Sequence, residues 1–353
     1  MRKEKAQIIF EDGTTFSGNV FAEGKACDAE VVFNTSMLGY QEVLTDPSYK
    51  NQMVVLTAPM VGNYGINKSD NESSHIQVSA LLVREYCPNY CNWEANESLK
   101  SFLEQQNVIG IECLDTRKLT NYLRKNGASQ ARIQVEGQAQ SDPAPTTVAL
   151  KQNAPLVTSN EDKAYHIGLI DMGVKQSIID RLESVNCRVS ILTPMVSADE
   201  ILNAGYDGIM VSNGPGNPED YTATIATVQN VLGKIPLFGI CLGQQILGLS
   251  LGAKINKLKF GHHGSNHPII NLDNKKVEIS AQNHNYVICS DSIADTAIEC
   301  THINLLDNSI AGIKAEDHWA FAVQYHPEAG PGPEDSLYLF KDFLQMINQF
   351  KAQ

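Results

Sequence analysis

The residue best suited to covalent chemistry in this chain is Cys241, which lies in the stretch Gly239-Ile240-Cys241-Leu242-Gly243. The apolar run before it, Ile235 to Ile240, favours a buried strand, and the apolar residues from Leu242 onward recur at helical spacing. Glycines on both sides allow the tight strand-to-helix turn of a nucleophile elbow. Because a helix that begins at the sulfur favours the thiolate, we predict that Cys241 is a nucleophile. The alternative is a buried cysteine that packs as a small apolar residue.

A nucleophilic cysteine needs a base, and the best candidate is His326 in Tyr325-His326-Pro327-Glu328. The residues from Trp319 to Tyr325 read as a strand, so His326 follows a strand end, where a parallel sheet gathers catalytic groups. The proline turns the chain, which allows Glu328 to bend back and orient the imidazole. A histidine in this place is more often structural, but its combination with a cysteine elbow predicts a triad.

A loop before the elbow is a candidate source of hydrogen-bond donors. The apolar run Gly208 to Val211 leads into Ser212-Asn213-Gly214-Pro215-Gly216-Asn217-Pro218, which exposes backbone N–H groups. Beside Cys241, this loop and the Leu242 N–H would form an oxyanion hole, in which one donor typically contributes about 3–4 kcal/mol to transition-state stabilisation. On its own, a loop rich in glycine and proline is usually only a turn.

Several motifs carry a resemblance to a known family. The motifs S-N-G-P-G-N-P, G-I-C-L-G-Q-Q and Q-Y-H-P-E, in this order, resemble those of the class I (triad-type) glutamine amidotransferases. The chain is more similar still to the small subunits of carbamoyl-phosphate synthase, through K-F-G-H-H-G-S-N-H-P at 259–268, A-Q-N-H-N-Y at 281–286 and F-N-T-S-M-L-G-Y-Q-E-V-L-T-D-P-S-Y at 33–49. The resemblance covers nearly the whole chain.

The resemblance implies a role for each matching residue. In this family the elbow cysteine attacks the side-chain amide of glutamine and forms a glutamyl thioester, which implies that role for Cys241. It further implies that His326 is the general base and acid and that Glu328 orients it. Glutamine-binding and oxyanion positions of the family match Gly214, Gly216, Leu242 and Gln245. The segment that holds the substrate backbone matches Asn283, Asn285 and Tyr286. A position of the smaller domain at the glutamine site matches Ser48.

The resemblance also implies a partner. The released ammonia would pass inside a complex to a large subunit, which joins it to bicarbonate and makes carbamoyl phosphate. ATP and magnesium would be used by that subunit, and this chain would need no cofactor of its own. Neither a Walker loop nor a Rossmann glycine motif occurs in a strand–helix setting in this sequence, which agrees with that division.

The sequence departs from the family pattern at a few positions. Gln244 stands where the elbow usually has histidine, and Asn285 replaces a usual glycine whose backbone contacts the substrate. Because asparagine tolerates left-handed geometry better than most residues, we expect the backbone at Asn285 to be kept. The other departures remove no catalytic group: Ser36, Leu38 and Gly330.

Two further hypotheses remain open. A glutaminase for another synthase, or a stand-alone γ-glutamyl hydrolase, would keep residues 165–353 but has no reason to carry 33–49. A non-catalytic scaffold in the same assembly is disfavoured by the intact cysteine, histidine and glutamate. The motifs do not distinguish arginine from pyrimidine synthesis.

Composition limits the class of partner and the compartment. The formal net charge of −13 argues against nucleic acid or an anionic membrane as the main partner. The eight cysteines show no disulfide framework, which suits a reducing cytoplasm. The N-terminus leads into no long apolar run, so we predict no signal peptide and no transmembrane span. His262, His263 and His267 lie in a predicted glycine-bearing loop without an acidic or thiol ligand in register, so we predict no metal site.

The pattern of elements predicts an α/β protein with two domains. Residues 165–353 alternate strands and helices, which favours a doubly wound, mostly parallel sheet with the elbow at a strand end. After residue 254 the pattern predicts further strands near 276–280, 285–288, 295–300 and 309–315. Residues 1–140 read as a β-rich α+β domain without catalytic motifs, and we predict that it serves for docking. Its clearest features are a hairpin turn at Glu11-Asp12-Gly13, a predicted strand over 76–83 and a helix over 115–126. Residues 141–164, rich in proline and polar residues, are the predicted linker, with a possible short helix at 146–151.

Overall fold

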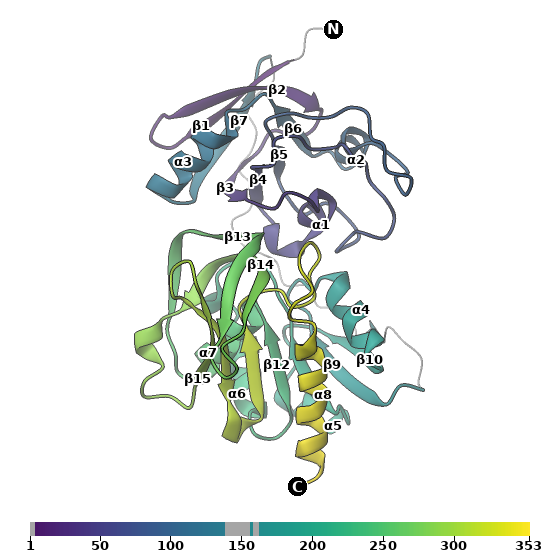
Figure 1. The fold of residues 1–353 in the computed structure, drawn as a ribbon, viewed down its shortest axis with the longest axis vertical. Coiled ribbons are helices and arrows are strands. Elements are labelled where there is room, and N and C mark those ends of the chain that lie inside the picture. Colours follow the sequence, from purple (N-terminus) through teal and green to yellow (C-terminus); the bar gives the residue numbers. More distant parts are fainter. Residues whose placement is uncertain (1–3, 138–155, 158–161) are drawn as a thin grey trace. The chain divides into compact units, whose positions relative to one another are not determined.

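The chain divides into two compact units in a computed structural model that describes residues 4–137, 156–157 and 162–353 (Figure 1). Unit 1 comprises Met1–Val148 and Lys259–Gly264, and unit 2 comprises Ala149–Leu258 and Ser265–Gln353. Most of the predicted linker, 141–164, and the whole of the predicted helix at 146–151 lie outside the described residues. Each unit is described below by itself.

Unit 1 is built on a closed barrel in the order β1-β2-β6-β5-β4-β3-β7. Neighbours from β3 to β6 pair in parallel, and the remaining neighbours pair antiparallel. The predicted hairpin turn joins β1 to β2, with Gly13 at φ 83°. Closing the sheet leaves no free strand edge. The strands are β1 (Lys5–Phe10), β2 (Thr15–Ala22), β3 (Asp28–Asn34), β4 (Gln52–Leu56), β5 (Ala80–Leu82), β6 (Ile109–Glu112) and β7 (Ser129–Val135).

The helices of unit 1 begin and end at residues with capping geometry. In α3 (Thr116–Asn126) the Asp115 carboxylate accepts a hydrogen bond from the Lys118 N–H at 2.9 Å, and Gly127 ends the helix at φ 101°. The helix predicted over 115–126 is therefore confirmed, together with its cap. The sequence analysis did not predict α1 (Tyr40–Thr45), and the strand that it predicted over 76–83 is shorter, because only β5 pairs there. The remaining helix of this unit is α2 (Leu99–Gln105).

Unit 2 contains the predicted doubly wound sheet. Its strand order is β14-β13-β15-β16-β17-β12-β11-β9-β10-β8, in which β8 is Leu156–Val157, and the run from β17 to β10 is parallel throughout. The parallel strands are short and apolar, which suits burial on both faces. These strands are β9 (Tyr165–Ile170), β10 (Cys187–Leu192), β11 (Gly208–Val211), β12 (Leu237–Ile240) and β17 (Ala320–Val323).

Helices cover both faces of the parallel strands. One core joins alternate strand residues such as Ile209 and Leu237 to helices α5 (Ala198–Asn203), α6 (Thr222–Val231) and α7 (Leu242–Ser250). The opposite core joins residues such as Met210 and Phe238 to α4 (Gln176–Ser184) and α8 (Tyr338–Lys351). The two cores separate residues that are adjacent in sequence, as expected for strands whose side chains alternate between faces.

The antiparallel part of the sheet corrects two expectations. The predicted loop that holds His262, His263 and His267 is instead part of strand β13 (Ile255–Asn271). Its glycines were interpreted as turn signals, but Gly261 and Gly264, at φ 70° and 151°, lie within the strand. The predicted strands at 276–280 and 285–288 form one strand, β14 (Val277–Ile288), and two more strands follow, β15 (Glu299–Asn304) and β16 (Ile310–Ala315).

The segment 259–264 also departs from the predicted domain boundaries, which assigned it to 165–353. The contacts of this segment place it in unit 1. The Thr35 N–H bonds the His263 carbonyl at 3.1 Å, and the Ala128 N–H bonds the Lys259 carbonyl at 2.9 Å. Strand β13 therefore runs through both units.

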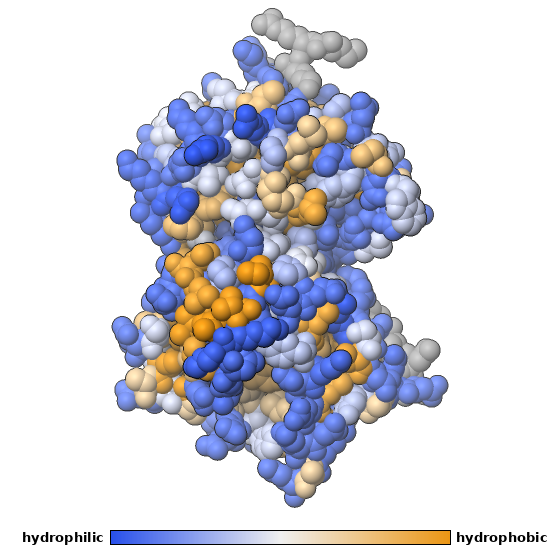
Figure 2. All heavy atoms as spheres, viewed as in Figure 1, coloured by the Kyte–Doolittle hydropathy of each residue, from blue (hydrophilic) through white to orange (hydrophobic). Residues whose placement is uncertain are grey.

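An apolar patch lies on the surface of unit 2. Figure 2 shows apolar side chains gathered over the region where β13 and β14 lie in Figure 1. The exposed apolar residues of unit 2 include Val277 and Ile279 on β14, and Leu305 and Leu306 in the turn between β15 and β16. Exposed apolar patches often mark contacts with other proteins. Among the described residues, no helix is both long and apolar enough to span a membrane.

Candidate functional site: a buried cysteine triad

The elbow at Cys241 has the strained backbone that the glycine spacing predicts. Cys241 connects β12 directly to α7 and has φ 55° and ψ −102°, which is unfavourable for a residue with a side chain. A Cβ at Gly239 would lie 2.7 Å from the Gly243 carbonyl, and one at Gly243 would lie 2.1 Å from the Val211 carbonyl oxygen. Only glycine at both positions permits this turn, which places the thiol at the N-terminus of α7.

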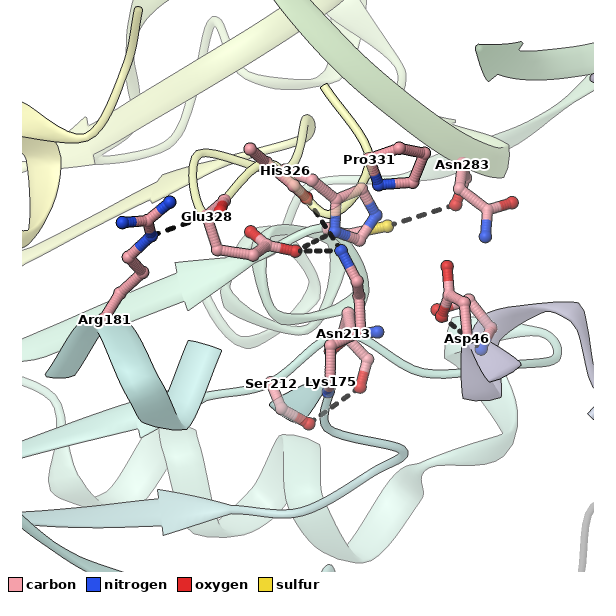
Figure 3. A network of polar contacts seen from close by, with 12 residues as sticks. Asp46, Lys175, Arg181, Ser212, Asn213, Asn283, His326, Glu328 and Pro331 are labelled. Carbon is pink, nitrogen blue, oxygen red and sulfur yellow. Dashed lines mark hydrogen bonds and ion pairs between the residues drawn. The ribbon is translucent and has the colours of Figure 1, made fainter. Parts of the chain in front are cut away.

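His326 and Glu328 lie beside the thiol, at the end of the neighbouring strand. His326 follows β17, which pairs in parallel with β12, and its N–H bonds the Ala281 carbonyl at 2.9 Å. Its Nδ1 lies 2.6 Å from Glu328 Oε1, which requires the proton on Nδ1 and leaves Nε2 for the thiol. Figure 3 shows the imidazole of His326 beside the Glu328 carboxylate. The structure therefore brings the three predicted triad residues together.

The surroundings of Cys241 distinguish a nucleophile from a cysteine that only fills space. The side chain is 2 % exposed, which either interpretation would allow. Its Sγ, however, lies 3.5 Å from the Asn283 carbonyl oxygen and accepts a long contact of 3.8 Å from the Gln324 amide. Cys241 also belongs to an apolar core cluster, but a cysteine that serves only as packing needs no polar partners at its sulfur.

A buried lysine completes the charge network, and sequence analysis missed it. Lys175 follows β9, and its Nζ lies 2.9 Å from Glu328 Oε1 and 2.9 Å from the Ala329 carbonyl oxygen. The side chains of Lys175 and Glu328 are 2 % and 0 % exposed. Lys175 comes five residues after the end of a parallel strand, where site residues gather, and that position was the available signal.

The pKa values follow from this network. Burial raises the pKa of Glu328, but the charges of Lys175 and His326 outweigh it and hold the pKa well below its ordinary value. Burial lowers the pKa of His326, but the Glu328 carboxylate and the Cys241 thiol outweigh it and raise the pKa above its ordinary value. The imidazole is therefore a stronger base than a free histidine, which favours proton transfer from the thiol.

The loop after β11 lies at the same edge of the sheet. Ser212 Oγ accepts a hydrogen bond from the Met172 N–H at 2.9 Å and donates one to the Asn213 carbonyl at 2.7 Å. A Cβ at Gly214 would lie 2.4 Å from the Met172 carbonyl oxygen and 3.0 Å from Leu242 Cδ2. Gly214 therefore packs against the first residue of α7, where oxyanion donors were predicted. Gly216, at φ 91°, takes a conformation that favours glycine.

Gln245 connects three elements around the thiol. Its Nε2 donates to the Tyr286 carbonyl at 2.8 Å and to Gln324 Oε1 at 3.1 Å. Gln324, which precedes the Tyr-His-Pro-Glu motif, in turn donates to Cys241 Sγ. Sequence analysis did not assign Gln324 a role. Its position two residues before the catalytic histidine, with its side chain on the opposite face to that of Tyr325, was the signal.

The predicted substrate-binding residues are divided between the units. Asn283, Asn285 and Tyr286 all lie on β14 in unit 2. Asn285 does not have a positive φ, so its backbone does not need the tolerance of left-handed geometry that the sequence analysis invoked, and the expectation that the backbone is kept stays a prediction. Extended strand backbone explains the difference, since any residue adopts it. Ser48 lies in unit 1, in a short 3₁₀ turn, and its N–H donates to Asp46 Oδ1 at 2.9 Å.

Comparison with known proteins identifies the family. Residues 8–133 match the domain family "Carbamoyl-phosphate synthase small chain, CPSase domain", and residues 168–346 match "Glutamine amidotransferase class-I". The carbamoyl phosphate synthase small chain of Chlorobaculum tepidum is 43 % identical, over 99 % of this chain and 100 % of its own length. The chain belongs to the carbamoyl phosphate synthase small chain family. A pyrimidine-specific small chain from Halalkalibacterium halodurans is 42 % identical, over 98 % of both chains.

The elbow and the triad residues lie within the residues that match the amidotransferase family. The small chain of Bacillus caldolyticus is a further relative, 41 % identical over 99 % of this chain and 98 % of its own. Matches of this length leave no large part of the chain outside the family. Among the described residues, no group of three or more His, Cys, Asp or Glu side chains could hold a metal ion.

Proposed function

We propose that this chain hydrolyses glutamine as the small subunit of a carbamoyl phosphate synthase and supplies ammonia to the large subunit. The observation that carries the proposal is the strained Cys241 beside His326, whose Nδ1 is held by a buried carboxylate 2.6 Å away. A thiol, a base and an orienting carboxylate in this arrangement perform acyl transfer.

The reaction follows from these positions. His326 Nε2 takes the thiol proton as Cys241 Sγ attacks the side-chain carbonyl carbon of glutamine. The imidazolium then gives that proton to the amide nitrogen, the C–N bond breaks, and ammonia leaves a glutamyl thioester. Water, deprotonated by His326, attacks the thioester and releases glutamate, and the proton returns to the thiolate. Glu328 keeps the imidazole oriented through both stages.

We assign the remaining roles by position. The N–H groups of Leu242 and of the loop at Gly214 and Gly216 would stabilise the oxyanion, because the N-terminus of α7 points its N–H groups toward the developing charge. Gln245 and β14, with Asn283, Asn285 and Tyr286, would hold the amino-acid end of glutamine. The role of Ser48 rests on the family resemblance alone.

The partner in this proposal is a large synthetase subunit that uses ATP, magnesium and bicarbonate. Unit 1 has no catalytic motif, and we propose that residues 1–140 supply much of the docking surface. The exposed apolar patch on unit 2 is the competing surface. Leu38 of unit 1 and Leu306 of unit 2 are both exposed, so they make a matched pair. In co-purification with the large subunit, Leu38→Asp should weaken retention more than Leu306→Asp. The reverse order would indicate that the docking surface lies on unit 2. A cytoplasmic location is part of this proposal.

The decisive experiment separates the thiol chemistry from the synthase reaction. Cys241→Ser should abolish glutamine-dependent carbamoyl phosphate synthesis by the reconstituted complex but leave ammonia-dependent synthesis intact. For the unaltered chain, glutamate release should rise roughly 5- to 150-fold when the large subunit, ATP and bicarbonate are added, the range of typical coupling energies. Retained glutaminase activity in Cys241→Ser would refute the nucleophile. An isolated chain as fast as the full mixture would instead identify a stand-alone hydrolase.

A further inference from the structure

Unit 2 contains a second concave site that the glutaminase reaction does not use. A cavity of about 640 Å³ lies between the strands β15 to β17 and helix α8. Its lining follows β17 from Ala320 to Val323, whereas His326 lies beyond the carboxyl end of that strand. None of the residues proposed to bind or cleave glutamine lines it. Cavities of roughly 300–1,000 Å³ are the size that small organic ligands occupy.

The apolar wall of this cavity is rigid and aromatic. Phe321 stacks on Phe238 with ring centroids 4.4 Å apart, and Trp319 meets Phe350 edge to face at 5.5 Å. Leu339 and Met346 add aliphatic surface from α8. Rings held by their neighbours in this way offer a preformed surface that loses little conformational entropy when a ligand binds.

A β-bulge directs a polar pair toward the cavity. The register between β15 and β16 shifts on both sides of His302, and bulges of this kind reorient side chains. His302 Nδ1 lies 2.9 Å from Thr301 Oγ1, and its Nε2 lies 3.5 Å from the Tyr338 hydroxyl. A Cβ at Gly312 would lie 2.4 Å from His302 Nδ1, so only glycine accommodates the pair.

The charges of the lining are predominantly negative. Burial lowers the pKa of His302 to about 4, so this residue is neutral at physiological pH. Of the described residues that line the cavity, Lys314 is the one with a permanent positive charge, and Glu299 holds it at 3.2 Å. Four carboxylates line the cavity: Asp273, Glu316, Asp317 and Asp342.

Asp342 is the carboxylate best placed to receive a ligand. It lies on α8, and it has no hydrogen bond or ion pair with any described residue. The surrounding protein raises the pKa of Asp342 by partial desolvation. A cation that paired with this carboxylate would remove that desolvation cost, whereas an anion would increase it.

We propose that this cavity binds a small organic cation, an amine or guanidinium with an apolar or aromatic body. The cationic end would pair with Asp342 and lie near the faces of the aromatic side chains, which attract cations. The apolar body would cover Phe321, Leu339 and Met346. The site is separate from the Cys241 site, and the proposal does not depend on the glutaminase assignment.

Calorimetry with the full chain tests the proposal, with phenethylammonium as the probe. We expect saturable one-to-one binding, with phenethyl alcohol and 3-phenylpropanoate at least about tenfold weaker because they lack the cation. Asp342→Asn should weaken phenethylammonium binding about fivefold or more, and Tyr338→Phe should weaken it less. The matched control is Asp291→Asn, an exposed aspartate outside the lining, which should change nothing.

Two further measurements keep the outcome unambiguous. Saturating glutamine should not displace the probe, because glutamine is assigned to the other site. Thermal melting should show that both aspartate variants remain folded. Equal affinity for the anionic analogue, equal effects of the two aspartate substitutions, displacement by glutamine, or no saturable binding at millimolar probe would each overturn the proposal.

Discussion

Two buried glutamines, one in each unit, differ in whether their amides are hydrogen-bonded. In unit 1 the Gln41 amide is 1 % exposed, and it donates to the Asn67 carbonyl at 2.8 Å and to Asn71 Oδ1 at 2.9 Å while accepting from the Asn67 N–H. In unit 2 the Gln244 amide is 0 % exposed, and neither of its polar atoms has a hydrogen-bond partner. A satisfied network fixes a structure, whereas unsatisfied groups cost stability.

The ion pairs of the two units also differ in how deeply they are buried. The ion pair between Asp28 and Arg132 of unit 1 lies at the surface, with side chains 20 % and 41 % exposed. In unit 2, Lys175 and Glu328 form an ion pair that is almost completely buried. The polar groups of unit 2 gather where parallel strands end, which is where this fold places its chemistry.

The largest expected effect is on catalysis. His326→Asn should lower the rate of glutamyl thioester formation about 10²- to 10⁴-fold, because the thiol loses its proton acceptor. The measurement is single-turnover glutamate release. In unit 1, His75→Asn is the matched substitution, since His75 is exposed and bonds only neighbouring side chains. A comparable loss in both variants would contradict the division of roles between the units.

The buried ion pair should dominate stability. Lys175→Met leaves the Glu328 carboxylate without its cation, and breaking a buried pair in this way typically costs about 3–5 kcal/mol. Arg132→Met breaks the exposed pair of unit 1, for which about 0.2–1 kcal/mol is typical. Urea unfolding of both variants makes the comparison. Equal costs would show that Glu328 is stabilised by His326 alone or is protonated.

Much of the fold and of the candidate site was predictable from the sequence, for reasons that differ from one element to another. The elbow was predictable because the turn needs glycine at both 239 and 243, where a Cβ would meet the Gly243 carbonyl and the Val211 carbonyl. The α3 helix was predictable because Asp115 and Gly127 cap it locally. Strand β13 was not predictable, since its glycines carry the signal of a loop and only pairing with distant strands makes it a strand. Lys175 was missed because its partner, Glu328, is 153 residues away in sequence.

The pH dependence of the reaction should report the Glu328 carboxylate. Its charge raises the pKa of His326, so the imidazolium that protonates the leaving nitrogen persists to higher pH than for a free histidine. Glu328→Gln removes the charge and lowers the pKa of His326. The basic limb of the kcat profile should therefore move to lower pH by about 1–3 units, the typical effect of an adjacent opposite charge. An unmoved limb would mean that another group donates the proton.

Substitution of one glycine in each unit tests whether backbone strain or lack of space makes a side chain destabilising there. Gly243→Ala places a Cβ 2.1 Å from the Val211 carbonyl oxygen, and overpacking of this kind costs about 1–3 kcal/mol. Gly13→Ala in unit 1 meets nothing within 4 Å and should cost only the left-handed strain at φ 83°, about 1–2 kcal/mol. Thermal unfolding compares them, and Gly243→Ala should also lower kcat because it displaces Cys241. Full activity in a folded Gly243→Ala variant would argue against the elbow.

The smallest expected effect is on the stability of variants at the two buried glutamines. The change in the free energy of unfolding should have opposite signs at Gln244 and Gln41. Gln244→Met removes an amide whose polar atoms are buried without partners, so the variant should be more stable by about 1–2 kcal/mol. Gln41→Met has nearly the same change in shape but leaves the Asn67 N–H and carbonyl unpaired, so it should be less stable by about 1–3 kcal/mol. Denaturant midpoints measure both. If Gln244→Met is instead destabilised, the Gln244 amide has a partner in solution, such as a bound water. The two buried glutamines would then both be hydrogen-bonded.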